Sequence, residues 1–144
     1  MILTNPYCTR TFAPIKALLM VAFMMPSQGM AKQGLDKEVE INNGLITISM
    51  ADTIRNACPD ISARFVEAFI FLKSLESQAL TLGYDTSEIK EFINDADEKD
   101  RVLDLAQTGL TNIGVLPDQP ATYCTVGLAE IQAGSAIGKL LKAK

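Results

Sequence analysis

The residues best able to do chemistry in this chain are its cysteines, because the sequence contains no histidine. Without histidine, neither a Ser-His-Asp nor a Cys-His nucleophilic site can form, and the usual His-containing zinc sites are excluded. The cysteines are Cys8, Cys58 and Cys124, and no two of them have the Cys-x-x-Cys spacing of a thiol redox site. They can therefore form a disulfide or remain as free thiols, one of which could be reactive.

The acidic residues form a second group with chemical potential. The segment 94–100, NDADEKD, resembles the start of an EF-hand calcium loop. Counted from Asp95, however, the loop needs Gly at its sixth position and Glu at its twelfth, where this chain has Asp100 and Ala106. We therefore expect a solvated helix face and no metal site. Its expected ion pairs, four residues apart, are Asp95 with Lys99 and Asp97 with Arg101.

Residues 1–31 have the pattern of a cleavable secretory signal peptide. Arg10 and Lys16 precede the apolar run Ala17–Met25, and Gly29-Met30-Ala31 supplies small residues at the cleavage positions. A retained membrane anchor is the alternative, but a spanning helix needs about 20 apolar residues. We predict cleavage between Ala31 and Lys32, a periplasmic location, and a single domain over 32–144.

Cleavage changes the cysteine count and the net charge. It removes Cys8 and leaves Cys58 and Cys124, an even pair in an oxidising compartment, which predicts a disulfide between them. It also removes Arg10 and Lys16, so 11 basic residues remain against 17 acidic ones and the net charge becomes −6. That charge argues against nucleic acid or an anionic membrane as the partner.

The hydrophobic periodicity predicts an all-α fold, a small bundle of four to five helices with one disulfide. We expect the second helix to be central, because its apolar stripe is wide, and Asp60 to cap it. The third begins at a capping box, Asp85 to Glu88, and is expected to be continuous, with a kink near 95–100 as the alternative. No strand is expected. The predicted helices cover about 37–57, 61–82, 86–113, 119–132 and 136–142.

Several apolar residues could contact a ligand or a partner, although apolar residues at helical spacing usually form the core. Phe65, Phe69, Phe71 and Phe92 could line a pocket, and Phe71 lies off the main stripe. The last predicted helix could dock on a partner or pack back onto the domain. The residues that we consider for partner contact are Phe71, Ile137, Lys139, Leu141 and Lys142.

Several segments resemble one protein family. The segments are Cys58–Arg64 (CPDISAR), Leu82–Tyr84, Tyr123-Cys124 and 137–141 (IGKLL). They are similar to the domain-of-unknown-function family 5333, small exported alphaproteobacterial proteins with no assigned activity. This chain has Leu128 where the family tends to have Arg, so no role for that charge carries over. Genes of this family can lie among respiratory NADH dehydrogenase genes, so the resemblance would imply an accessory role in a respiratory complex.

The sequence thus predicts an exported helical domain, monomeric or weakly associating, that binds or scaffolds another protein. We expect it not to be an enzyme and to need no cofactor or metal. One alternative is an acid-stress periplasmic chaperone, which would use protonation of its acids to expose the Phe65/Phe69 face. The others are an accessory factor of a respiratory complex and a carboxylate-using enzyme.

Overall fold

The structure is a computed structural model that describes residues 33–144. The predicted signal peptide, its cleavage site and Cys8 lie outside the described residues. The described part is helical, as predicted, and none of its helices has both the length and the hydrophobicity needed to cross a membrane. Its helices are α1 (Val39–Ala57), α2 (Phe65–Thr81), α3 (Thr86–Asn94), α4 (Ala96–Asn112) and α5 (Pro120–Ala133). Its short elements are η1 (Leu35–Lys37), β1 (Ile61–Ala63), η2 (Gly138–Leu140) and β2 (Leu141–Ala143).

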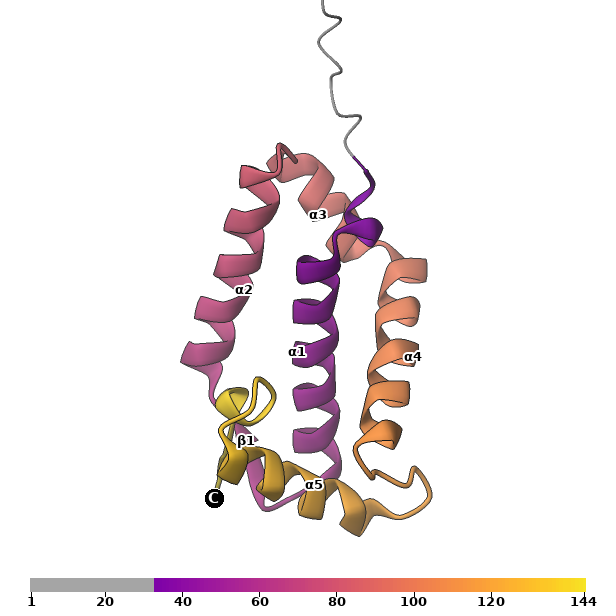
Figure 1. Cartoon of the computed structure of the whole chain (residues 1–144), viewed down its shortest axis with the longest axis vertical. Coiled ribbons are helices and arrows are strands. Elements are labelled where there is room, and N and C mark those ends of the chain that lie inside the picture. Colours follow the sequence, from indigo (N-terminus) through magenta and orange to yellow (C-terminus); the bar gives the residue numbers. More distant parts are fainter. Residues whose placement is uncertain (1–32) are drawn as a thin grey trace, which may run out of the picture. The chain divides into compact units, whose positions relative to one another are not determined.

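Helix α1 is the central element of the domain. Figure 1 shows α2 on one side of α1 and α4 on the other, with α3 joining them at one end. Helix α5 and the C-terminal segment cross the opposite end and pack on α1. The main core lies where α1, α4, α5, β1 and the C-terminal segment meet. Its fully buried members include Ile54, Cys58, Ile61, Leu110 and Leu141.

A two-stranded antiparallel sheet corrects four sequence predictions. Strands β1 and β2 pair with each other, so that Ile61 lies opposite Ala143 and Ala63 lies opposite Leu141. The second helix therefore begins at Phe65, not at 61, and Asp60 does not cap it. In place of the helix predicted over 136–142, the chain forms the short 3-10 helix η2 and strand β2. The expectation of no strand was wrong because this pairing joins segments far apart in the chain, and such contacts override local periodicity.

The predicted continuous helix over 86–113 is also wrong. Asp95 has extended backbone dihedrals, φ −62° and ψ 132°, which end α3, and its side chain accepts a 2.9 Å hydrogen bond from the Glu98 amide to cap α4. The expected pairs four residues apart do not form, since Arg101 binds Glu98 and the Lys99 ammonium donates to the Asn94 carbonyl. The capping box at Asp85 is confirmed.

The predicted disulfide is confirmed. It joins Cys58, the residue that ends α1, to Cys124 in α5. Gly127 lies one turn after Cys124, and a Cβ there would lie 2.5 Å from the Ile61 side chain and 2.6 Å from that of Ile54. The covalent bond and this close helix packing together fix α5 across the end of α1.

Candidate functional site

Helix α2 is not the central helix that its sequence predicts. Of its side chains only Leu75 and Ala79 are buried, whereas Phe65 and Phe69 are 70% and 61% exposed. Gly44 of α1 brings Leu75 close, because a Cβ at position 44 would lie 2.5 Å from a Leu75 methyl carbon. In the first half of α2, only Ala68 and Phe71 are partly buried against the main core. The chaperone alternative expected acid to uncover Phe65 and Phe69, but they are already uncovered.

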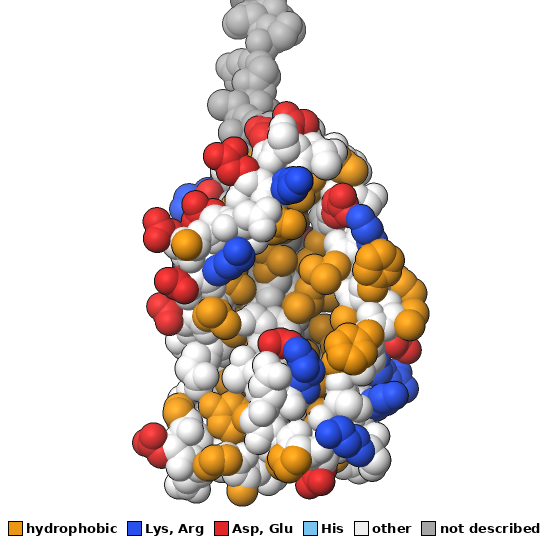
Figure 2. All heavy atoms as spheres, turned by 180° about the vertical axis from the view of Figure 1, so that it is seen from behind, with side chains coloured by type: hydrophobic (Ala, Val, Ile, Leu, Met, Phe, Trp, Pro, Cys, Tyr) orange, Lys and Arg blue, Asp and Glu red, His pale blue; other side chains and the backbone are white. Residues whose placement is uncertain are grey.

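An apolar groove lies between the exposed side of α2 and helices α3 and α4. It consists of two adjoining cavities of about 370 and 360 Å³, which share Leu45, Phe92 and Ile93. Helix α1 supplies its floor, and Figure 2 shows the hollow with hydrophobic side chains inside it. We use the name apolar groove for the surface formed by Ile41, Leu45 and Ile48 of α1, Phe69 and Leu72 of α2, Ile89, Phe92 and Ile93 of α3, and Val102 and Leu103 of α4.

The groove is apolar yet open to solvent. Four of its large side chains, on three different helices, are between 42% and 61% exposed: Phe69, Leu72, Ile93 and Leu103. An exposed apolar side chain is ordinary when it is isolated, but several lining one hollow indicate an interaction site. Phe69 and Phe92 were predicted from the sequence as pocket candidates, whereas Leu72, Ile93 and Leu103 were not. The signal for an uncovered α2 was its first half, where apolar residues lie on more than one side: Phe65, Val66, Phe69 and Ile70.

The charges that border the groove are distributed unevenly. Each of its three acidic residues binds a basic neighbour. These pairs are Asp52 with Arg55 at 2.5 Å, Glu76 with Lys73 at 2.5 Å, and Glu98 with Arg101 at 2.7 Å. Lys90 of α3 and Lys99 of α4 form no ion pair within residues 33–144. Among the residues of α3 and α4 that line the two cavities, the unpaired charges are therefore both positive.

Two basic side chains also contact exposed phenylalanine rings. The Arg55 guanidinium lies 5.9 Å from the centre of the Phe65 ring, and the Lys73 ammonium lies 5.9 Å from that of Phe69. These are cation–π distances. Since Arg55 also binds Asp52, which lines the groove, the Phe65 ring lies near the end of the groove next to the main core.

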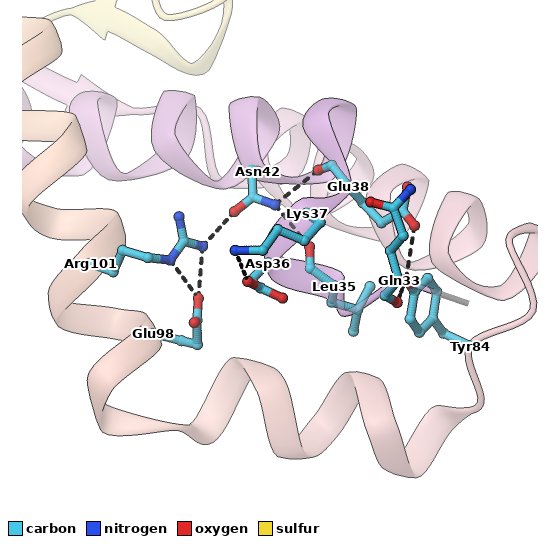
Figure 3. Close-up of polar contacts among 9 residues, drawn as sticks. All are labelled: Gln33, Leu35, Asp36, Lys37, Glu38, Asn42, Tyr84, Glu98 and Arg101. Carbon is cyan, nitrogen blue, oxygen red and sulfur yellow. Dashed lines mark hydrogen bonds and ion pairs between the residues drawn. The ribbon is translucent and has the colours of Figure 1, made fainter. Parts of the chain in front are cut away.

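A buried polar network fixes the segment 33–38 beside the groove. The Asn42 amide donates hydrogen bonds to the carbonyls of Leu35 at 2.8 Å and Glu38 at 2.9 Å, and Arg101 donates to the Asn42 side-chain oxygen. Figure 3 shows these contacts converging on α1. Asn42 is only 8% exposed, so its hydrogen bonds satisfy a side chain that would otherwise be costly to bury.

Tyr84 extends this network to the turn before α3. Its hydroxyl donates to the Gln33 carbonyl and to the Glu38 carboxylate, the latter at 2.8 Å. Burial, together with the hydrogen bond and the negative charge of Glu38, raises the pKa of Tyr84 to about 12. Tyr84 therefore stays neutral at physiological pH and serves to position the segment, with no sign of acid–base activation.

The residues predicted to contact a partner have different positions. Ile137 and Leu141 are buried in the main core, so the prediction that they form surface contacts is wrong. The C-terminal segment instead packs back onto the domain. Phe71 is half-buried against the same core, and Lys139 and Lys142 are exposed. None of the five lines the apolar groove.

One cluster has the composition of a metal site but not its chemistry. Ligand-type atoms of Cys58, Asp60 and Cys124 lie within 4.8 Å of one another. Both sulfurs are bonded to each other, however, so the cluster offers no thiolate ligand.

The fold and the groove define a small disulfide-linked helical domain with one uncovered apolar face. The sequence profile of a family of unknown function (DUF5333) matches residues 33–142, and the chain belongs to this family. The match confirms the resemblance carried by the Cys58–Arg64 and Tyr123-Cys124 segments. No curated protein and no solved structure gives a significant match.

Proposed function

We propose that this protein is an exported, non-catalytic module that binds an α-helical segment of another protein in its apolar groove. The observation that carries the proposal is the set of four large side chains left exposed around an apolar floor: Phe69, Leu72, Ile93 and Leu103. Covering apolar surface is the main source of association free energy. Amphipathic helices commonly bind in such grooves.

The dimensions of the groove favour a helix as its occupant. Its floor runs along α1 from Ile41 to Asp52, which corresponds to roughly 16 Å, or about three helical turns. Helices α2 and α4 flank α1 on either side (Figure 1), so a helix lying over α1 between them would complete a four-helix arrangement.

The contacts of the groove's acids support a binding role without catalysis. Asp52, Glu76 and Glu98 are each bound to a basic side chain, so no two of these carboxylates share a site where they could exchange a proton. Export is supported by the signal-peptide pattern of residues 1–31 and by a disulfide of the kind that persists in oxidising compartments.

Site-specific photocrosslinking in the native host tests the proposal. A photoreactive residue replaces Leu72 or Leu103 in the groove or, as a control, the exposed Leu128 on α5. We expect a discrete crosslinked protein from the groove positions alone, its loss in a Phe69→Asp variant, and its crosslinked peptide to be helical and amphipathic. Equal crosslinking from Leu128, or none from the groove, would contradict the proposal. Intact mass of the same samples tests export, with Lys32 expected as the first residue.

A further inference from the structure

We infer that the helix bound by the apolar groove is acidic along one edge only, the edge that faces α3 and α4. This inference rests on the proposed function, because it describes the partner of the same site. It follows from the contrast between the two walls of the groove, one of which has unpaired positive charge while the other is electrically balanced.

The wall formed by α3 and α4 has two exposed lysines that lack a carboxylate partner within residues 33–144. Lys90 borders the first cavity, and Lys99 borders the second, where its ammonium reaches only the Asn94 carbonyl. Of the acids on α3 and α4, only Glu98 lines either cavity. Glu98 binds Arg101, and Asp95 caps α4. Glu91 lines a separate polar hollow and neither of the two cavities.

The opposite wall of the groove, formed by α2, has no charge left unpaired within residues 33–144 that would favour an acidic or a basic partner. Lys73 of α2 binds Glu76 at 2.5 Å and also lies over the Phe69 ring, so its charge is already compensated. At the end of the groove next to the main core, Asp52 and Arg55 form a second balanced pair. A bound helix would therefore gain from carboxylates near Lys90 and Lys99 and gain little from charge on its other edge.

Figure 2 shows basic side chains beside the hollow. This local positive charge contrasts with the net negative charge of the chain. From Lys32 on, the sequence has a net charge of −6. A mostly acidic protein repels acidic partners at long range, so local positive charge at one wall selects the orientation in which an acidic helix can approach. The apolar stems of the two lysines can also cover the edge of the bound helix.

The test uses three fluorescein-labelled 16-residue peptides that share one leucine stripe at helical spacing. They differ only along one flank, which carries glutamate, glutamine or lysine. Fluorescence anisotropy measures their affinity for the purified protein, for a Lys90→Gln/Lys99→Gln variant, and for a Lys139→Gln/Lys142→Gln control that removes the same charge outside the groove. We expect the glutamate peptide to bind roughly fivefold more tightly than the glutamine peptide, as two exposed ion pairs would give.

The groove variant should lose this preference, the control should retain it, and 0.5 M salt should reduce it. If all three peptides bind equally, the acidic-edge inference fails while the proposed function stands. If no peptide binds, and binding is equally absent from a Phe69→Asp variant, the proposed function itself fails. Light scattering that shows a dimer dissociated by Phe69→Asp would make a second copy the occupant and overturn both.

Discussion

The main core and the apolar groove share helices α1 and α4, and yet their side chains differ in how far they are exposed to solvent. Helix α4 contributes the fully buried Leu110 to the main core and the 53% exposed Leu103 to the groove. Helix α1 likewise contributes Ile54 to the core and Leu45 and Ile48 to the groove floor. The difference is in what covers each part: α5, β1 and the C-terminal segment cover the core, whereas nothing in residues 33–144 covers the groove. Within residues 33–144, apolar side chains on one helix are thus buried at one end and exposed at the other, according to which segments pack over them.

Breaking the disulfide should give the largest effect, because the bond acts only on the main core. In the chain-entropy model, a link between residues 66 apart stabilises the fold by about 4 kcal/mol. A Cys58→Ala/Cys124→Ala variant should therefore unfold at a much lower temperature, as measured by circular dichroism. Reductant should shift the wild-type protein to the same transition and leave the variant unchanged. A transition that moves by only a few degrees would show that packing alone holds the core.

A pair of leucines on one helix measures the contrast most directly. Leu110→Ala should cost about 3 kcal/mol in the free energy of unfolding, since it leaves a cavity in a packed core. Leu103→Ala should change the free energy of unfolding by no more than about 0.5 kcal/mol, because the Leu103 side chain is about half exposed to solvent. Urea unfolding of the two variants, made in parallel, gives the comparison. Equal losses would mean that the groove wall is as closely packed as the core.

The polar network beside the groove should give an intermediate effect. Asn42→Ala removes the donor to the carbonyls of Leu35 and Glu38 and the acceptor from Arg101, and should cost about 2 kcal/mol. The neighbouring Asn43 is exposed, so Asn43→Ala is the matched control and should be nearly neutral. Amide hydrogen exchange should show lost protection in residues 33–38 of the Asn42 variant alone. Unchanged protection there would contradict the role given to Asn42.

Tyr84 should give the smallest effect, and only in alkali. Because its pKa is raised in the folded protein to about 12, the folded state holds the phenolic proton more tightly than the unfolded state does. This contribution to stability is fully present below about pH 10, the ordinary tyrosine pKa, and is lost as the pH rises through about 12. Urea midpoints measured across that range should fall more steeply for the wild type than for Tyr84→Phe. Parallel slopes would show that the hydroxyl titrates alike in both states.

The sequence predicted those parts of the fold that local chemistry specifies. The capping box at Asp85 specified the start of α3, and the predicted range 119–132 differs from α5 by one residue at each end. The disulfide followed from an even pair of cysteines after the expected cleavage. In each case a few neighbouring residues, or a count of residues, were sufficient.

The parts of the fold that the sequence did not predict depend on contacts between segments far apart in the chain. Residues 61–63 form a strand only because residues 141–143 lie beside them. The groove was missed for a related reason. A wide apolar stripe on α2 predicts burial, but whether anything covers that stripe is a property of the whole fold, and Phe65 and Phe69 remained exposed.

The pairing of β1 with β2 also affects the order in which the parts of this domain can fold. Ile61 is made early, but Leu141, its neighbour in the main core, follows about 80 residues later, which at ordinary rates of translation means a delay on the order of 4 to 16 seconds. Throughout that interval the main core lacks Leu140 and Leu141, two of its buried members. The main core of residues 33–144 is therefore completed last, when residues 141–143 become available to pair with residues 61–63.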